Sequence, residues 1–587
     1  MQLDAIAMRS RRVRGPAWVF FLGLFLAPMG PESRLARTAR GDDAPAAKTV
    51  APAVPTTSAA PSASAGAESA DEVLERALDL ERKRDWIGAM RAYDNALERW
   101  PSRVEFRHRR RLCESHYRLS RRYQDPSFRN VLLKLDRERS LALYDELLEQ
   151  IESNYVDRVA YEPLVRRGFD NMEVALRDNR FLTLNGASDA SVERVKPLRD
   201  VLRAERMRLV VPDRAAAVSL ASLACDLSAR SLGLSAAGVL EEFIHGACDA
   251  LDDYTAYLTP DRLNELNALI EGDFVGLGVE LKHDDAGLKL VGVLEGGPAF
   301  EAGLKPGDVI TSINGQSLKG LGLDDSASRL QGTEGSRVRL ELRRADGSRR
   351  SFDLTRRHVE VKSVVHTRII DRGAGVGYLR LNGFQKTSGE EIDAAVQALV
   401  DRGMRSLVID LRGNPGGLLV VGVEIARRFI NDGVIVTTQG RAPGQTQIYE
   451  THNRATWTMP LAVLIDHDSA SASEILAGAL KDHGRALILG ERTYGKGSVQ
   501  SIFTLRSAPT GLKLTTAKFY SPLNRPYSEQ GVEPDVLVRS SALPTAKQRT
   551  DAERAALEEN FGDPVRDPVT KIAVDRLTKA SAARLSN

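Results

Sequence analysis

Cysteine is scarce in this chain, and the few cysteines lie far apart. The 587 residues include only Cys113, Cys225 and Cys248. An odd number at such spacings indicates neither a disulfide framework nor a metal-binding cluster. The sequence also lacks a His-Glu-x-x-His segment and a Cys-x-x-Cys pair, which are common ligand spacings of zinc sites. We therefore expect no metal site, no metal-dependent hydrolysis and no cofactor.

Excess charge and long apolar runs are also lacking. The formal net charge is only +3, so charge alone gives no reason to expect a nucleic-acid partner. Beyond residue 30, no stretch approaches the roughly 18 apolar residues that cross a membrane. The composition, 42% hydrophobic and 27% charged, is ordinary for a globular protein. Because 587 residues exceed what one core serves, we expect several domains.

The N-terminus has the pattern of an export signal. Arg9, Arg11, Arg12 and Arg14 precede the apolar run AWVFFLGLFLAPMG at residues 17–30. A basic segment before a short apolar one predicts a signal peptide or membrane anchor within residues 1–40, with a buried helix as the alternative. Residues 41–70 are rich in Ala, Pro and Ser, which is typical of a disordered linker. We expect an exported protein, periplasmic or otherwise extracytoplasmic, that is either freed by cleavage or left membrane-anchored.

Residues 71–232 have apolar residues at helical spacing. The first 31 of them resemble one tetratricopeptide-type helix pair, in which Trp86, Ala89, Tyr93 and Ala96 pack between the helices. A plain helical hairpin fits this segment equally well. Binding of a protein partner is one function expected of such a helical region. Helical patterning continues through residues 233–271.

Residues 272–356 have short β-branched runs separated by Gly and Pro turns, which predict a small β-rich domain. The segment resembles a PDZ domain in its loop Gly276-Leu277-Gly278-Val279 and in GPAFEAGLKPGDVITSINGQSL. The resemblance implies that backbone N–H groups of this loop hold a peptide carboxylate and that the peptide adds a strand to the sheet. Its partners would be proteins or peptides with free, apolar C-termini. The alternative is that these glycines only form a tight turn.

Strand and helix patterns alternate over residues 357–545, which predicts an α/β domain with a mixed sheet. Residues 546–587 are charged and helical in pattern, and the sequence assigns them no role. The fold class we expect is therefore multidomain α+β, with a helical N-terminal region, a small PDZ-like β domain and an α/β core.

The first candidate for chemistry is the stretch DHDSASASEILAGAL at residues 466–480. A strand leads into small residues and then into a helix, so Ser471 would sit at a turn beside helix N–H groups. That arrangement suits a nucleophile next to its oxyanion donors. The alternative is structural, because Ser471-x-x-Glu474 is itself a capping box.

The second candidate is GERTYGKGSVQ at residues 490–500, which resembles a phosphate-binding loop. That loop needs Gly-x-x-x-x-Gly-Lys-[Ser/Thr], and Gly497 stands where its hydroxyl residue belongs. Lys496 would instead be a general base for Ser471, since a serine without histidine can use lysine. Its pKa would then have to fall from about 10.4 toward 7–8, and burial between Gly495 and Gly497 could lower it. His467 and His483 lie near Ser471 in sequence but without a recognisable pattern.

Together these stretches resemble the C-terminal processing peptidases, also called tail-specific proteases, over about residues 233–540. The shared motifs occur in the family's order: ALDDYTAYLTPDRLNEL, VIDLRGNPGG, SASASEI, GERTYGKGSVQ, GLKLTTAKFYSP and GVEPDV. The resemblance implies that Ser471 is the nucleophile, Lys496 the base and Gln500 a residue that orients Lys496. Ser471 is the middle one of Ser469, Ser471 and Ser473.

The same resemblance implies an oxyanion hole formed by the N–H of Ala472 and that of a glycine, with Gly416 preferred over Gly417. The activity expected is that of an exported serine endopeptidase that forms an acyl-enzyme and recognises substrate C-termini with its PDZ domain. Two alternatives remain: an idle scaffold that binds protein C-termini, and a nucleotide-binding protein built on GERTYGKG.

Overall fold

The computed structural model describes residues 21–22, 69–321, 326–327, 329–344, 346–452, 454–539 and 560–585. Apart from the two-residue strand β1 (Phe21–Leu22), the expected signal segment and linker lie outside the described residues. The chain divides into two units, Leu26–Tyr123 and the remainder, which are described separately. Within the described residues, no helix has the length and apolar character that a membrane span requires.

The smaller unit contains three helices, α1 (Ala70–Arg82), α2 (Trp86–Arg99) and α3 (Val104–Gln124). Helix α1 begins where Ser69 and Glu72 cap each other's backbone N–H groups. Ala89, Tyr93 and Ala96 of α2 are buried, and they pack with α1 in one apolar cluster. The helix pair predicted from the sequence is thus present.

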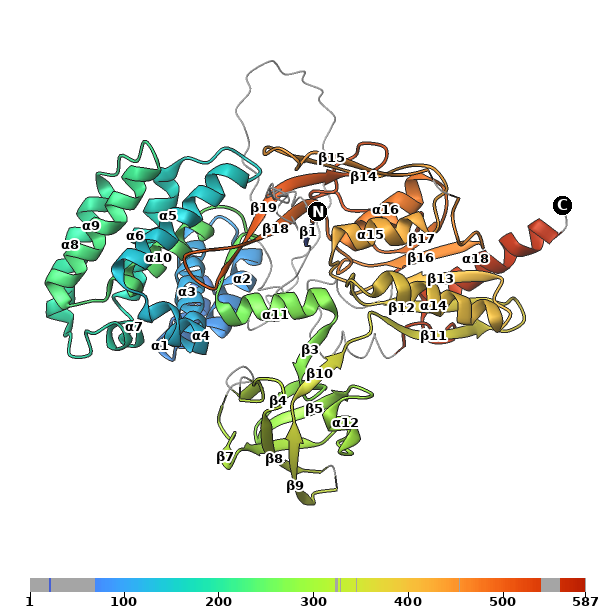
Figure 1. The fold of residues 1–587 in the computed structure, drawn as a ribbon, viewed down its shortest axis with the longest axis horizontal. Helices are drawn as coiled ribbons and strands as arrows, with labels where there is room; N and C mark the ends of the chain where they lie inside the picture. Colours follow the sequence, from blue (N-terminus) through green and yellow to red (C-terminus); the bar gives the residue numbers. More distant parts are fainter. Residues whose placement is uncertain are drawn as a thin grey trace, which may run out of the picture. The chain divides into compact units, whose positions relative to one another are not determined.

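The larger unit begins with further helices, which lie together in Figure 1. They are α4 (Pro126–Asn130), the 3₁₀ turn η1 (Leu132–Lys134), α5 (Arg137–Asn154), α6 (Tyr161–Ala175), α7 (Asn179–Leu184), α8 (Val192–Met207), α9 (Arg214–Leu232) and α10 (Ala236–Asp249). Helix α10 is buried along most of its length. Gly246 of α10 lies against the backbone of Gly168 in α6, where an added Cβ would come within 2.5 Å. The missing side chain lets the two helices approach closely.

Residues 233–271 are not wholly helical. They contain the short strand β2 (Ala256–Leu258) before α11 (Pro260–Glu271). Strand β2 pairs with β19, with Ala256 opposite Lys513. The prediction of helix was wrong at these three residues because so short a segment cannot show the alternation of a strand. They form a strand because they pair with β19.

A small β domain follows, drawn at the bottom of Figure 1. Its sheet has the order β4 (Val279–Asp284), β5 (Gly287–Val293), β6 (Val309–Ile313), β8 (Arg337–Arg343), β9 (Arg349–Thr355). Strand β7 (Gln316–Ser317) also pairs with β6. The domain also contains the short helix α12 (Pro298–Glu301). Strands β3 (Asp273–Gly276) and β10 (Arg357–Glu360) pair antiparallel and join this domain to the rest.

The α/β core is built on a second six-stranded sheet. Its order is β11 (Val364–Asp371), β12 (Val376–Leu381), β13 (Ser406–Asp410), β16 (Leu461–Ile465), β17 (Leu487–Gly490), β20 (Val536–Leu537). From β12 onward the strands are parallel, and β11 is antiparallel. The mixed sheet is as expected from the sequence.

Both faces of this sheet are covered, so its strands are continuous apolar runs. Leu407 and Ile409 of β13 face a cluster that includes α14 (Ser388–Asp401), α15 (Leu419–Arg427) and α16 (Ala472–Asp482). Val408 faces the opposite cluster, which includes α18 (Pro568–Leu585). The described part of the charged tail is thus part of the core, because apolar side chains of α18 cover one face of the sheet.

A third sheet has the order β1, β18 (Ser498–Thr504), β19 (Gly511–Tyr520), β14 (Gly433–Gly440), β15 (Gln447–Thr451), and β2 also pairs with β19. The helical region holds its β18–β19 hairpin directly. The carboxylate of Glu146 in α5 accepts hydrogen bonds from the N–H groups of Arg506 and Ser507, and the Val156 N–H donates to the Thr515 carbonyl at 2.9 Å.

Candidate active site

Ser471 sits at the turn between β16 and α16, as the sequence predicts. It is the residue before the first turn of α16 and has φ of 56°, a conformation that is strained for a residue other than glycine. Its side chain is 5% exposed. A strained, nearly buried serine at a helix N-terminus is a feature of sites where a hydroxyl must face backbone N–H donors.

The hydroxyls of the three neighbouring serines differ in what they contact. Ser469 Oγ donates to the Leu411 carbonyl at 2.8 Å, and Ser473 Oγ donates to the Asn414 carbonyl at 3.0 Å. In the described part of the chain, the Ser471 hydroxyl donates to no other group. Ser469 and Ser473 therefore tie the turn to the loop after β13, which leaves Ser471 as the hydroxyl available for chemistry.

Glu474 connects the turn at Ser471 to the loop at Lys496. Its Oε2 accepts from the N–H of Ser471 at 2.8 Å and from the N–H of Lys496 at 3.1 Å. Its Oε1 accepts from Thr493 Oγ1 and from the Gly495 N–H, both at 2.7 Å. The side chain is fully buried, and burial raises its pKa although these four hydrogen bonds oppose the change. The sequence pattern showed Glu474 only as half of a capping box.

Lys496 is almost fully buried, with 4% exposed. Gly495 and Gly497 have φ of 85° and 60°, and a Cβ on Gly497 would lie 2.1 Å from the Ser528 backbone nitrogen. The loop can therefore bury Lys496 only because both neighbours are glycine. Its Nζ lies 5.2 Å from the centre of the Tyr254 ring.

The Lys496 ammonium is disfavoured in this environment. Burial, together with the charge of Lys513, lowers the Lys496 pKa to about 7, while the carboxylates of Glu474 and Asp252 partly oppose the change. Lys513 in β19 is itself buried, and burial lowers its pKa to about 8. Sequence reasoning missed Lys513, although an apolar strand interrupted by lysine is a detectable signal.

Gln500 lies in β18 and is buried. Its Nε2 donates to Ser498 Oγ at 3.0 Å and to Thr515 Oγ1 at 3.2 Å. Among the described residues, no hydrogen bond joins Gln500 to Lys496. The orienting role of Gln500 therefore stays a prediction, with its amide oxygen as the atom that would accept from Lys496.

The loop after β13 lies directly against the serine turn. A Cβ on Gly416, whose φ is 101°, would lie 2.8 Å from Ser471 Cβ and 3.0 Å from the Ala472 nitrogen. The Gly416 N–H itself donates to Asn414 Oδ1 at 2.8 Å. Gly416 is thus close to the position where an oxyanion would be held, but its N–H is engaged in this structure. Which of Gly416 and Gly417 donates stays a prediction.

The two histidines near Ser471 in sequence contact other parts of the structure. His483 lies at the far end of α16, where its Nε2 contacts the Val434 carbonyl at 2.7 Å. The His467 ring lies 5.7 Å from the Tyr494 ring, centre to centre. Within the described residues, no group of three His, Cys, Asp or Glu is placed to hold a metal ion.

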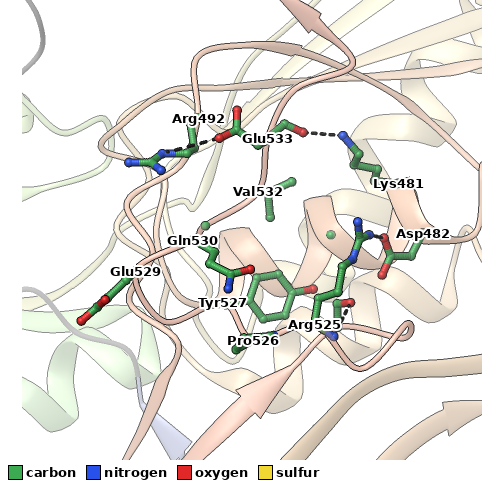
Figure 2. A pocket seen from close by; sticks show the side chains of 13 residues that line it. Lys481, Asp482, Arg492, Arg525, Pro526, Tyr527, Glu529, Gln530, Val532 and Glu533 are labelled. Carbon is green, nitrogen blue, oxygen red and sulfur yellow. Dashed lines mark hydrogen bonds and ion pairs between the residues drawn. The ribbon is translucent and has the colours of Figure 1, made fainter. Parts of the chain in front are cut away.

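A pocket of about 330 Å³ lies behind these elements, and neither Ser471 nor Lys496 lines it. Figure 2 shows Tyr527 at its centre, Lys481 and Asp482 of α16 on one side and Glu529 on the other. The Glu529 N–H donates to the Gly495 carbonyl at 2.8 Å. The segment that carries Tyr527 and Glu529 thus contacts both α16, through the Lys481 bond to the Glu533 carbonyl, and the lysine loop.

The loop Gly276-Leu277-Gly278-Val279 joins β3 to β4 in the small β domain. Gly278 has φ of 73°. Its carbonyl accepts from Leu294, and the Leu277 carbonyl accepts from Ala299 at the start of α12. The N–H groups of Leu277 and Gly278 donate no hydrogen bond to any residue that the structure describes. The loop is thus fixed through its carbonyls, which leaves those N–H groups for a ligand.

Comparisons with known proteins identify the family of this chain. The profile of peptidase family S41 matches residues 375–538, and that of the PDZ domain matches residues 290–344. The carboxyl-terminal-processing protease of Synechocystis sp. is 35% identical over 314 residues, which are 52% of this chain and 73% of that protein. The chain belongs to peptidase family S41, in the group of carboxyl-terminal-processing proteases.

Other relatives of this peptidase carry similar names. Carboxyl-terminal-processing peptidase 2, chloroplastic, of Arabidopsis thaliana is 38% identical over 297 residues, 48% of this chain and 57% of that protein. The solved structure of a photosystem II D1 C-terminal processing protease is 28% identical and covers 70% of this chain and 98% of its own, with a TM-score of 0.35. The predictions of family, PDZ domain and fold class from the sequence are confirmed.

Proposed function

We propose that this peptidase is an exported endopeptidase that cleaves proteins with a Ser471–Lys496 dyad and an acyl-enzyme intermediate. The observation that carries the proposal is the single carboxylate of Glu474, which holds the backbones of both residues while Lys496 is buried with a pKa of about 7. A lysine with that pKa is substantially neutral near pH 7 and can accept a proton.

In the proposed reaction, neutral Lys496 Nζ takes the proton of Ser471 Oγ as the oxygen attacks the substrate carbonyl. The N–H of Ala472 and that of Gly416 or Gly417 stabilise the oxyanion. Use of Gly416 requires its N–H to leave Asn414 Oδ1. The lysine ammonium then protonates the departing amine, which leaves an ester on Ser471. Lys496 next deprotonates a water that hydrolyses the ester, and the Ser471 proton is restored.

Substrates would be chosen by their C-termini. The N–H groups of residues 276–279 offer a site for a free carboxylate, and the peptide would add a strand to the sheet of the PDZ domain. An apolar last residue suits this site, because the loop itself brings no charged side chain.

We infer that the peptidase acts outside the cytoplasm. The basis is the sequence of residues 9–30, where four arginines precede a short apolar run. Fractionation of cells that express the full chain tests this directly. Cytosolic protein with an intact N-terminus would contradict export without affecting the proposed chemistry.

The dyad is tested by labelling with a serine-directed phosphonate and by hydrolysis of an unstructured protein. Wild type should be labelled on Ser471, and Ser471→Ala should be neither labelled nor active. Lys496→Arg should be as inactive as Lys496→Ala, because arginine keeps the charge but does not deprotonate in proteins. Substantial turnover by Lys496→Arg would exclude Lys496 as the base. Absence of labelling and of turnover in wild type would instead favour an idle scaffold.

A further inference from the structure

Asp567 and Arg412 form a buried ion pair between the C-terminal segment and the α/β core. The Asp567 carboxylate accepts from Arg412 Nη1 at 3.1 Å and from Nη2 at 2.6 Å. The two side chains are 3% and 1% exposed. Parallel hydrogen bonds of this kind fix the orientation of a guanidinium as well as its position. The S41 match ends at residue 538, so Asp567 lies outside the region that resembles the family.

The remaining side of Arg412 is also occupied. Asp410 accepts from Nε and Nη2, at 2.9 and 2.6 Å, and Tyr378 donates to the same Asp410 carboxylate at 2.8 Å. Phe561 stacks on the guanidinium, with the Arg412 Cζ 3.8 Å from the ring centre. The C-terminal segment therefore supplies two of the groups that enclose Arg412, an anion at its edge and a ring on its face.

Asp567 is in turn fixed by its own segment. Its carboxylate accepts from the Val569 N–H at 3.1 Å and from Thr570 Oγ1 at 2.6 Å at the start of α18. Burial by itself would raise the Asp567 pKa, but hydrogen bonds from Arg412 and Thr570 outweigh it and keep that pKa below the usual value. The carboxylate therefore stays charged opposite Arg412 at neutral pH.

Arg412 is the residue from which the loop beside Ser471 begins. Gly413 donates its N–H to Asp466 at 2.9 Å, and Asn414 donates from Nδ2 to the Leu381 carbonyl at 2.7 Å. Two residues later, Gly416 packs on Ser471 and Ala472. A displacement of Arg412 would thus move Gly416 at the proposed oxyanion site, because only three residues of one short loop lie between them.

We propose that Asp567 is a positioning residue for the peptidase site, which through Arg412 holds residues 413–417 against Ser471. The C-terminal helix is then a required part of the catalytic unit. The inference rests on the proposed Ser471 chemistry. Removal of Asp567 leaves one edge of a buried guanidinium unpaired, and a buried charge without its partner is unfavourable. Arg412 would shift toward water or toward Asp410 alone and move the loop.

The test compares Asp567→Asn with wild type by steady-state proteolysis and by the rate at which Ser471 reacts with a serine-directed phosphonate. Both kcat and the labelling rate should fall by roughly ten- to hundredfold, the usual effect of a displacement of about 1 Å at an active site. KM should change less than twofold, because the PDZ domain proposed to bind the substrate is untouched. Asp567→Glu, which keeps the charge, should recover part of both rates.

Asp575→Asn is the matched control, since this exposed aspartate lies on α18, the helix that Asp567 immediately precedes. It should behave as wild type. If Asp567→Asn does not fold, Phe561→Leu provides the second test, because it removes the ring that lies 3.8 Å from Arg412 Cζ and, less closely, 4.8 Å from Arg380 Cζ. Phe561→Leu should also lower the labelling rate, by a smaller factor than Asp567→Asn. Unchanged kcat and labelling in a folded Asp567→Asn, or unchanged labelling in Phe561→Leu where the first variant does not fold, would overturn the proposal.

The two proposals fail separately. If Ser471→Ala remains active, the nucleophile is misassigned whatever Asp567 does. If Ser471→Ala is inactive while folded Asp567→Asn has wild-type rates, only the positioning role of Asp567 is wrong.

Discussion

Ser471 and Lys496 present their backbone N–H groups to the same atom, Oε2 of Glu474, at 2.8 and 3.1 Å. The two residues are 25 positions apart in sequence and lie on different elements. One carboxylate thus fixes the start of the nucleophile's helix relative to the lysine loop. Every other expectation about the site depends on this link.

Glu474→Gln should lower both activity and stability. The amide has one oxygen in place of two, so its NH₂ group would face N–H or O–H donors that now bond to the carboxylate. Buried donors left without an acceptor cost about 1–3 kcal/mol each. Proteolysis and thermal unfolding of the variant check this. Glu529→Gln is the control, since that side chain is exposed nearby, and equal behaviour of the two variants would contradict the role of Glu474.

The three serines should separate cleanly by substitution. Ser471→Ala should be inactive but folded. Ser469→Ala and Ser473→Ala should keep most activity and lose about 1 kcal/mol of stability each, because each loses a hydrogen bond to a buried carbonyl. Chemical denaturation and phosphonate labelling measure the two effects. An inactive Ser473→Ala beside an active Ser471→Ala would shift the nucleophile by two residues.

Lys496→Met should be inactive yet more stable than wild type at neutral pH. A pKa lowered from 10.5 to about 7 means that the folded state gives up a proton that the unfolded state keeps, at a cost on the order of 4 kcal/mol. Between these pH values the unfolded wild-type protein binds the extra proton, so its stability should rise with pH. The variant should show a smaller rise that begins at higher pH, because only Lys513, with a pKa lowered to about 8, still contributes to it. Denaturation across a pH series measures both, and parallel curves for the two proteins would show that Lys496 is not perturbed.

Activity of wild type should rise with pH through about 7, as Lys496 loses its proton. In Lys513→Met that rise should move to higher pH, because a neighbouring positive charge that opposes protonation of Lys496 is gone. Lys513→Met should therefore be less active than wild type at pH 7 and should regain activity in more alkaline buffer. Lys518→Met, on the same strand but exposed, should leave the profile unchanged. A midpoint that stays at the wild-type value in Lys513→Met would rule out this coupling.

Amidation of a substrate's C-terminus should weaken binding at the PDZ domain. The amide removes the anion that the N–H groups of residues 276–279 would hold, and KM should rise by about tenfold, as for loss of charge-assisted hydrogen bonds. Cleavage of paired peptides with free and amidated ends measures this. Equal KM values would argue against capture of a carboxylate.

Some features of this protein follow from the sequence alone because their signals are local. The apolar run at residues 407–409 specifies a strand buried on both faces. The glycines on either side of Lys496 specify a loop that can bury an amine. A turn of small residues before a helix specifies where Ser471 can stand. Each of these depends on residues within one turn or strand, so the order of motifs along the chain was enough to identify the family.

Other features were decided by contacts between distant segments. The capping-box pattern did not reveal that Glu474 also holds Lys496, because one carboxylate oxygen can accept two hydrogen bonds and only the fold shows which distant N–H group supplies the second. In the sequence, Lys513 is only one residue of a strand. The structure shows that burial lowers the Lys513 pKa and that the charge of Lys513 lowers the pKa of Lys496. The charged C-terminal segment gave no reason to expect Asp567 beside Arg412, 155 residues away. A buried charge needs a partner from somewhere in the chain, and the tertiary structure alone determines which residue that is.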